Sequence, residues 1–174
     1  KSFFERSTPH VARISISGFI RPDRKFDEML ERIGKSDQVK GVVVEINSPG
    51  GAPSGGEALY EGLRKLAAKK PTVAHVDSLA ASAAYMAALG TDQIVVRRSA
   101  LTGSIGVLAQ WADVPELMGK LGVKLEEVKS SPLKAEPNPF KPASPEAKAA
   151  LDSMIRDSYG WFVSLVAERR GLSA

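Results

Sequence analysis

Apolar and polar positions follow one another along the chain in patterns whose period changes from segment to segment. Between residues 11 and 20, Val11, Ile14 and Ile16 stand among polar side chains, which indicates a half-buried strand. Short apolar runs predict further strands, and apolar residues three and four apart predict helices. The predicted strands cover residues 11–20, 39–46, 71–76, 93–96 and 123–128, and the predicted helices cover residues 26–33, 54–68, 82–89, 114–121 and 145–170.

This alternation predicts an α/β fold with a mostly parallel sheet covered by helices. Residues 1–10 are interpreted as a polar lead-in. Two stretches rich in turn-forming residues are interpreted as loops, namely Asn47 to Gly51 and the proline-rich residues 130–144. The sequence contains no repeat and no interior linker, so we expect a single domain over residues 1–174.

The composition excludes several classes of partner and of catalytic chemistry. Hydrophobic residues at 43% and charged residues at 25% are ordinary for a soluble globular protein, and the basic residues behind the net charge of +4 are scattered. We therefore expect no nucleic-acid partner. The absence of cysteine excludes thiol catalysis and disulfides, and the presence of only two histidines argues against a metal centre, so we expect no metal and no cofactor. No apolar run approaches the ~18 residues of a membrane span.

One stretch is a candidate for catalysis. Ser82 lies between the strand predicted at 71–76 and an alanine-rich helix, and its small neighbours leave the hydroxyl uncovered. A helix N-terminus offers unpaired N–H groups and partial positive charge, and both favour a developing oxyanion. Ser82 is therefore a candidate nucleophile. The alternative is that Ser82 only caps the helix, as serine often does.

A serine nucleophile needs a base, and two residue types are considered. His75 lies close to Ser82 in sequence, but no carboxylate is clearly placed to orient it, although Asp77 is near. Lysine is the alternative, provided that burial or a positive neighbour lowers its pKa enough to leave a neutral amine. Lys134 stands out because apolar and small residues flank it in the proline-rich loop, although a loop lysine is ordinarily solvated.

Two glycine-containing segments complete the set of candidates. Gly50-Gly51 follows a predicted buried strand and could direct a backbone N–H at an oxyanion, since glycine allows close approach and positive φ. Thr102-Gly103-Ser104 offers hydroxyls that could hold a lysine amine by hydrogen bonding. Each segment taken alone is equally consistent with a simple turn.

Together these segments resemble the bacterial signal peptide peptidase A family, membrane-attached serine proteases with a ClpP/crotonase-type fold. The similarity extends from about Val11 to Gly171. The matching segments occur in the family's order and at similar spacing: Asn47–Gly51, Ala80–Ser82, Leu101–Val107, Lys134 in its loop, and Tyr159–Arg170.

The resemblance implies a role for each matching residue. Ser82 would be the nucleophile, Lys134 the general base, and Ser104 the residue that orients the lysine. The N–H groups of Gly51 and Ala83 would form the oxyanion hole. An extended substrate would pair with segments near Gly51 and Ser104, and the expected substrate-binding residues are Gly50, Ala52, Tyr85 and Ile105.

The resemblance also implies a biological setting. Family members cleave hydrophobic peptides, especially remnant signal peptides, through an acyl-enzyme, and they form ring-like homo-oligomers in some of which neighbouring subunits complete the active sites. We therefore expect association with the bacterial cytoplasmic membrane, on the extracytoplasmic side, through a segment outside this chain. The family also continues with another short α/β segment.

The sequence departs from the family pattern at two places. The family usually has Gly-Gly after the nucleophile, where this sequence has Ala83-Ala84. If Ala83 takes a positive φ, we expect strain of about 1–3 kcal/mol; if Ala83 is helical, the alanine is harmless. The lysine loop has Ser131 where relatives often have glycine and Ala135 where they often have an acidic residue, which predicts a mobile loop.

Two rival functions remain at this point. A crotonase-like acyl-CoA enzyme would use a similar backbone oxyanion hole, with carboxylates as catalysts and an adenine pocket. A catalytically inactive relative would instead act as a scaffold for membrane-protein assemblies, and the Ala83-Ala84 pair keeps this interpretation open.

Overall fold

The sheet is parallel throughout the part of the chain that the structure, a computed structural model, describes, which is residues 8–173. Its strands lie in the order β1-β2-β3-β4, and β5 pairs with the end of β3 that lies beyond β4. The strands are β1 (His10–Ile20), β2 (Val39–Gly51), β3 (Thr72–Ala81), β4 (Gln93–Val96) and β5 (Leu101–Gly103). The prediction of an α/β fold with a mostly parallel sheet is confirmed.

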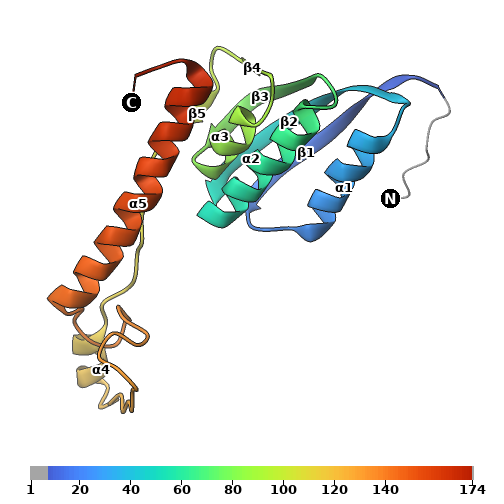
Figure 1. The fold of residues 1–174 in the computed structure, drawn as a ribbon. Coiled ribbons are helices and arrows are strands. Elements are labelled where there is room, and N and C mark those ends of the chain that lie inside the picture. The colour runs from blue at the N-terminus through green and yellow to red at the C-terminus, as the bar shows by residue number, and fades with distance from the viewer. Residues whose placement is uncertain (1–7, 174) are drawn as a thin grey trace. The chain divides into compact units, whose positions relative to one another are not determined.

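Helices alternate with the strands up to β4 (Figure 1). Asp23 caps α1, because its side chain accepts hydrogen bonds from Lys25 N and Phe26 N. Pro53 occupies the first turn of α2, where its missing N–H costs nothing. The helices are α1 (Arg24–Lys35), α2 (Pro53–Ala67), α3 (Ala83–Leu89), α4 (Pro115–Lys120) and α5 (Pro145–Arg170).

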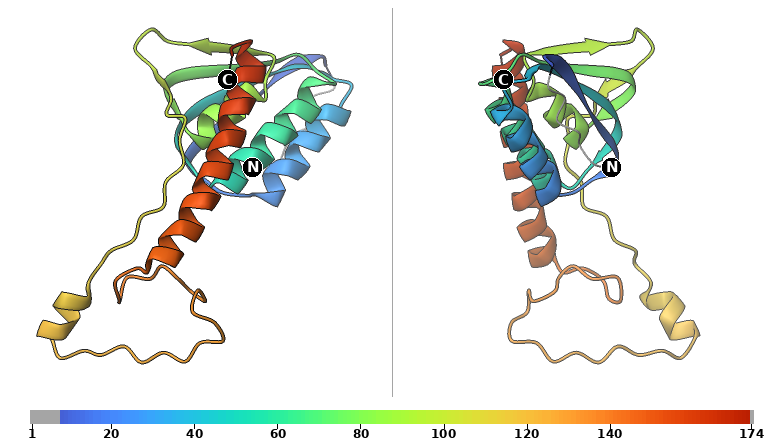
Figure 2. Two further views of the ribbon diagram at one scale, coloured as in Figure 1. Left: turned by 60° about the vertical axis from the view of Figure 1, so that its left-hand side comes forward. Right: turned by 90° about the vertical axis from the view of Figure 1, so that its right-hand side faces the viewer.

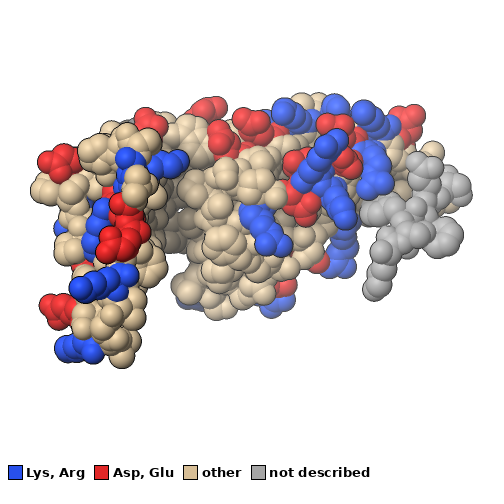
Figure 3. All heavy atoms as spheres, turned by 90° about the horizontal axis from the view of Figure 1, so that it is seen from below, with Lys and Arg blue, Asp and Glu red and all other residues tan. Residues whose placement is uncertain are grey.

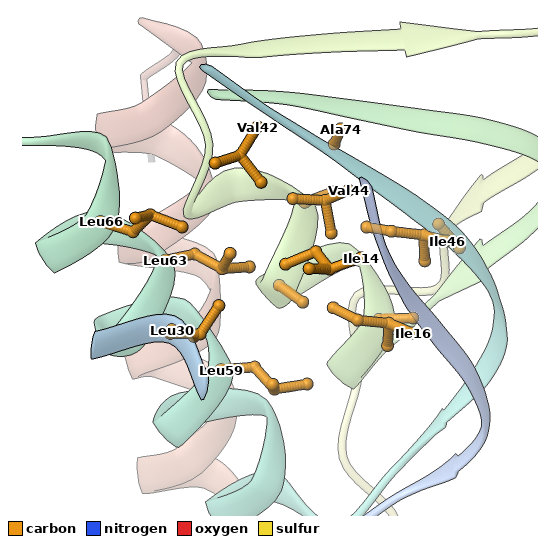
Figure 4. Close-up of a cluster of buried hydrophobic side chains, with 14 of the residues drawn as sticks. Ile14, Ile16, Leu30, Val42, Val44, Ile46, Leu59, Leu63, Leu66 and Ala74 are labelled. Atoms are coloured by element: carbon orange, nitrogen blue, oxygen red, sulfur yellow. The ribbon is translucent and has the colours of Figure 1, made fainter. Parts of the chain in front are cut away.

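The core lies between the sheet and the helices α1, α2 and α3, which cover one of its faces (Figure 2). Alternate side chains of the strands meet the apolar faces of the helices because side chains in a strand point to opposite faces of the sheet. Figure 4 shows apolar side chains from β1, β2, β3, α1 and α2 pointing toward one another, including Ile14, Val44, Leu30, Leu63 and Ala74. This packing holds the ends of β2 and β3, where Gly50, Gly51 and the turn to Ser82 lie.

A second, smaller cluster is made by the end of α5. Phe162, Leu165 and Val166 pack with Met86 and Leu89 of α3. Arg169 adds two hydrogen bonds, to the carbonyl oxygens of Leu89 at 3.0 Å and Thr91 at 3.1 Å. The last turns of α5 therefore fix the back of α3.

The described chain divides into two compact units. The first contains the residues up to Gly106 together with those from Phe162 onward, and the second contains Val107–Trp161. The first unit holds the whole sheet, and the second holds α4 and the proline-rich loop. The helix α5 contributes to both. The expectation of a single domain stays a prediction.

Most sequence-based elements are confirmed, and three details are wrong. Residues 123–128 form no strand, and Asn47 to Gly51 continue β2 rather than forming a loop. In β1, Ala12 rather than Val11 shares the buried face with Ile14 and Ile16, because a strand alternates strictly by two. Part of the predicted polar lead-in, residues 1–7, lies outside the described residues.

The charged residues on the face drawn in Figure 3 are interspersed rather than gathered by sign. Among the charged residues of the helices, Glu31 with Lys35 and Glu61 with Lys65 form exposed pairs one helical turn apart, both at 3.7 Å. Exposed pairs of this kind contribute little to stability.

Candidate active site

Ser82 has an unusual backbone conformation. It follows β3 and precedes α3 with φ 53° and ψ −122°, in a region that residues other than glycine rarely adopt. Its N–H donates to the carbonyl oxygen of Gly103 at 2.8 Å, and its own carbonyl oxygen accepts from Tyr85 N at 2.8 Å and Met86 N at 3.1 Å. The end of β5 and the first turn of α3 thus hold Ser82 in a conformation that costs on the order of 1–3 kcal/mol.

The hydroxyl of Ser82 is available for chemistry. Ser82 occupies the N-cap position of α3, but its side chain makes no capping hydrogen bond to the helix. Ala80, Ala83 and Ala84 around it are buried and small, whereas Ser82 itself is only half-buried. A sharp strand-to-helix turn therefore presents a hydroxyl among small side chains.

Gly50 lies against this turn. A β-carbon added to Gly50 would lie 2.7 Å from the carbonyl oxygen of Ala81, 2.9 Å from Cβ of Ser82 and 3.1 Å from the N atom of Ala83. Gly50 also has φ +102°. Any side chain here would fill the space beside the Ser82 side chain and the Ala83 N–H, so this position needs glycine for both space and conformation.

Ser48 fixes the end of β2 and was not singled out in the sequence. Its side chain is fully buried; the hydroxyl donates to the carbonyl oxygen of Gly18 at 2.6 Å and accepts from Gly50 N at 3.1 Å. Ser48 could have been identified from the sequence because it stands two residues before a glycine pair. This spacing allows a serine side chain to hydrogen-bond to the backbone of the following turn.

The two predicted oxyanion-hole donors are the N–H groups of Gly51, at the end of β2, and of Ala83, at the start of α3. Ala52 N donates to the carbonyl oxygen of Ile20 at 2.8 Å. Since successive N–H groups of a strand point to opposite sides, the N–H of Gly51 points away from β1, toward the β3 side of β2. Ala83 is the first residue of α3, where an N–H has no partner within the helix.

The alanine pair after Ser82 is compatible with this geometry. Ala83 begins α3, and the residues other than glycine with positive φ in the described chain are Ser82, Ser104 and Ala135. The strained conformation falls on Ser82 itself. Of the two outcomes considered from the sequence, the helical one holds, in which alanine is harmless.

Ser104 and Ile105 directly follow β5. The pairing of Ala81 with Gly103 places Ser104 just beyond the strand that flanks Ser82. Ser104 has φ 52° and is exposed, and Ile105 is 38% exposed. Both residues therefore lie at the sheet end where β3 passes into Ser82.

Ala52 and Tyr85 occupy the remaining predicted substrate-binding positions. Ala52 is half-buried between β2 and α2. Tyr85 is also half-buried and packs against both hydrophobic clusters. A role of either side chain in binding substrate stays a prediction.

Lys134 belongs to the second unit. It is exposed, and it lies in a turn in which its N–H donates to the carbonyl oxygen of Ser131 at 3.2 Å. Ser82, Gly50, Gly51, Ala83 and Ser104 all belong to the first unit. The pairing of Lys134 with Ser82 and Ser104 therefore stays a prediction.

His75 is too far along the strand to act as the general base for Ser82. It precedes Ser82 by seven residues along β3, a separation of about 20 Å in an extended strand. Its ring lies 3.9 Å from Asp77, whose carboxylate also pairs with Arg97. The arginine hydrogen bond holds the pKa of Asp77 below its usual value. The histidine-based triad considered from the sequence is therefore wrong.

Residues 8–173 provide neither a metal site nor a membrane-spanning helix. They contain no group of three or more histidine, aspartate or glutamate side chains arranged to hold a metal ion. None of their helices combines the length and the apolar character needed to cross a membrane.

Ser82 thus lies on a strained strand-to-helix turn beside a glycine-rich strand end. The model of peptidase family S49 matches residues 64–174. The chain belongs to this family, and its predicted place among the signal peptide peptidase A proteases is confirmed.

Several similar proteins carry protease names. A Methanocaldococcus jannaschii protein named "Putative protease MJ0651" is 40% identical over 150 residues, covering 86% of this chain and 48% of the relative. An Enterococcus faecium protein named "Putative signal peptide peptidase SppA" is 32% identical over 152 residues, covering 86% of this chain and 44% of the relative. The chain thus spans about half the length of these curated relatives.

Solved structures with a similar fold include a protease. It is a mutant of the "1510-N membrane-bound stomatin-specific protease", with a TM-score of 0.51 and 18% identity, and the match covers 67% of this chain and 60% of that one. At this identity the likeness concerns the fold alone.

Proposed function

We propose that this chain carries the catalytic machinery of a serine endopeptidase, with Ser82 as nucleophile and Lys134 as general base. The observation that carries the proposal is the strained Ser82, whose hydroxyl makes no capping hydrogen bond and whose Cβ lies against Gly50, next to the N atom of Ala83. Strain of this kind persists only where surrounding structure imposes it, and it is common at active sites. Membership of a peptidase family supports the same conclusion.

The reaction follows from the roles of these groups. The neutral amine of Lys134 takes the proton of the Ser82 hydroxyl, and the oxygen attacks the peptide carbonyl carbon. The N–H groups of Gly51 and Ala83 stabilise the oxyanion. The C–N bond then breaks as Lys134 returns the proton to the leaving amine. Water, deprotonated by the same lysine, hydrolyses the acyl-enzyme and restores the Ser82 hydroxyl.

The amine must be uncharged for this reaction, which requires surroundings with little water. Lys134 is exposed within its own unit. We therefore propose that bound peptide, or a neighbouring copy in a ring-like oligomer, covers the lysine before it acts. The Ser104 hydroxyl would then orient its amine.

The substrates we propose are apolar peptides such as remnant signal peptides. Ile105 is 38% exposed just beyond the strand that flanks Ser82, and it offers an apolar side chain for such a substrate. A relative that carries the name of a signal peptide peptidase supports the same substrate class. Membrane association through a segment outside this chain belongs to the same proposal.

Hydrolysis of an apolar fluorogenic peptide tests the mechanism. Ser82→Ala and Lys134→Ala should each lower kcat by at least about 10³-fold, because each removes a group that the acylation step requires. Circular dichroism should show an unchanged fold. A fluorophosphonate should label Ser82 in the wild-type protein, which also distinguishes the protease from an inactive scaffold. Full activity of Lys134→Ala would contradict the mechanism.

A further inference from the structure

A compact group of charged residues flanks the loop that carries Lys134. Lys129 and Glu136 stand at the two ends of residues 130–135, and Lys129 Nζ lies 2.5 Å from Glu136 Oε1. Both side chains are nearly buried, with 15% and 4% of their surface exposed. The pair therefore joins the two ends of the loop at one point.

Two further residues complete the group. Lys141 Nζ lies 2.6 Å from Glu136 Oε1 and 3.1 Å from Glu127 Oε2, and Lys129 Nζ lies 3.2 Å from the same Glu127 oxygen. The charges alternate around a closed ring of two lysines and two glutamates, which we call the loop clasp. The hydrogen bond from Lys129, followed by that from Lys141, holds the pKa of Glu136 below its usual value. Glu136 therefore stays charged at neutral pH.

The loop between these ends is itself ordered by short-range bonds. Lys134 N donates to Ser131 O at 3.2 Å, and Glu136 N donates to Leu133 O at 3.3 Å. Ala135, directly after Lys134, has φ 59°, a conformation unfavourable for alanine. Such a residue is maintained only where its neighbours constrain the chain on both sides. The clasp supplies that constraint.

Stability alone is a poor explanation for a clasp of this kind. Taking charges out of water offsets most of the attraction between them, and an apolar pair of similar size usually stabilises a fold as well. Glu136 also receives its three hydrogen bonds, from Lys129, Lys141 and Asn138, on Oε1, while Oε2 is buried without a partner among the described residues. The distinctive contribution of the clasp is a fixed geometry.

We infer that Lys129 and Glu136 are positioning residues, which close the base of the loop and fix the direction from which Lys134 approaches the serine hydroxyl. This inference rests on the proposed function. Neither residue takes part in proton transfer. A general base must come within hydrogen-bond reach of the proton that it removes, and small misplacements cost large factors in rate.

The test uses Glu136→Gln, which keeps the size of the side chain and removes its charge. Amide hydrogen exchange in residues 130–136 should accelerate on the order of tenfold. kcat for the apolar peptide should fall on the order of 10- to 100-fold, with KM changed less than about twofold, because the substrate still binds while the base is misplaced. The matched control is Asp152→Asn, which removes a carboxylate from an exposed pair with Arg156 in the same unit. Asp152→Asn should change neither the amide exchange of residues 130–136 nor kcat.

A charge-exchange variant separates position from mere stability. Exchanging all four charges (Glu127→Lys, Lys129→Glu, Glu136→Lys and Lys141→Glu) keeps the alternation of the ring and should recover a substantial part of the lost kcat. If Glu136→Gln does not fold, Lys129→Met combined with Glu136→Met decides, because it leaves neither member of the pair buried without its partner. That variant should fold and still show the reduced kcat.

The outcomes distinguish the inference from the function on which it rests. Wild-type kcat in a folded Glu136→Gln or double-methionine variant, with Lys134→Ala inactive, would overturn only the clasp. Accelerated exchange without any loss of kcat would overturn it equally. Full activity of Lys134→Ala would instead overturn the proposed function.

Discussion

At the scale of single residues, Ser82 determines the character of the site. Its conformation suits glycine, yet a hydroxyl is present. An unfavourable backbone conformation of this kind destabilises the fold, so the surrounding structure must impose it on Ser82. Gly50 and Ser48 are the residues that make room for the turn and hold the neighbouring strand end in place.

The strain at Ser82 predicts a difference between two inactivating substitutions. Ser82→Gly relieves about 1–3 kcal/mol of strain and loses about 0.4–1 kcal/mol to the greater freedom of the unfolded chain. Ser82→Ala relieves nothing. We expect Ser82→Gly to exceed Ser82→Ala in unfolding free energy by about 1 kcal/mol, seen as a melting temperature roughly 2–4 °C higher. Equal melting temperatures would mean that Ser82 is not strained.

At the scale of elements, the close approach of α2 to α3 positions the first turn after Ser82. A β-carbon at Gly56 would lie 2.9 Å from Cβ and 3.1 Å from Cα of Ala83, and 2.8 Å from the sulfur of Met86. Glycine inside a helix ordinarily weakens it. Gly56 is therefore explained by packing between the two helices.

Gly56→Ala tests this explanation against helix propensity. Propensity alone predicts stabilisation by up to about 1 kcal/mol, whereas overpacking against Ala83 predicts destabilisation by about 1–3 kcal/mol. We expect destabilisation in urea unfolding, together with slower labelling of Ser82. The matched control is Gly160→Ala in α5, where nothing lies within 4 Å of the added carbon and stabilisation is expected. A stabilised Gly56→Ala would show that the helices can separate without cost.

The loop clasp predicts a pH dependence of stability. Because the pKa of Glu136 is lower in the folded chain than when unfolded, its charge stabilises the fold above the unfolded value of about 4.3. This stabilisation is lost as pH falls through the folded pKa. The pKa of Lys141 is raised, so the lysine stays charged throughout this range.

Melting temperatures measured between pH 7 and pH 3 check this dependence. The wild-type protein should lose more stability over this range than Glu136→Gln, which has no charge left to neutralise at this position. Parallel curves for the two proteins would contradict it.

At the scale of the whole molecule, the end of the chain completes the packing behind the site. Phe162 is fully buried with Met86 and Leu89, residues that lie far from it in the sequence. This contact joins α5 to the helix that follows Ser82. The first unit therefore depends on residues from both ends of the described chain.

Phe162→Ala should lower the unfolding free energy by about 3–5 kcal/mol, because it removes a large buried side chain and leaves a cavity. The neighbouring Trp161 is larger but 39% exposed. Trp161→Ala should therefore cost only about 1 kcal/mol. Urea unfolding compares the two variants. A similar cost for both would mean that the end of α5 does not pack as described.

The sequence predicted elements more reliably than contacts. The periods of β1, α2 and α5 were clear because each element buries one face. The strand predicted at 123–128 failed because an apolar run shows a capacity for pairing without supplying a partner strand. In α5 the sequence predicted a long amphipathic helix, and within the first unit its buried side chains are Phe162, Leu165 and Val166, which pack with Met86 and Leu89 of α3.

By itself, the sequence determined the α/β class, the strand-to-helix junction at Ser82 and the glycine pair at Gly50, because local periodicity and residue size express these features directly. Only the tertiary structure decided that Gly50 lies against Ser82 and that the ring of His75 lies near the carboxylate of Asp77. It likewise decided that Ser48 fixes the end of β2 and that the loop clasp joins the two ends of the lysine loop. Those facts depend on strand register and on contacts between residues distant in the chain. Contacts between residues far apart in the chain are set by strand register and tertiary packing, and the local pattern of the sequence does not reveal them.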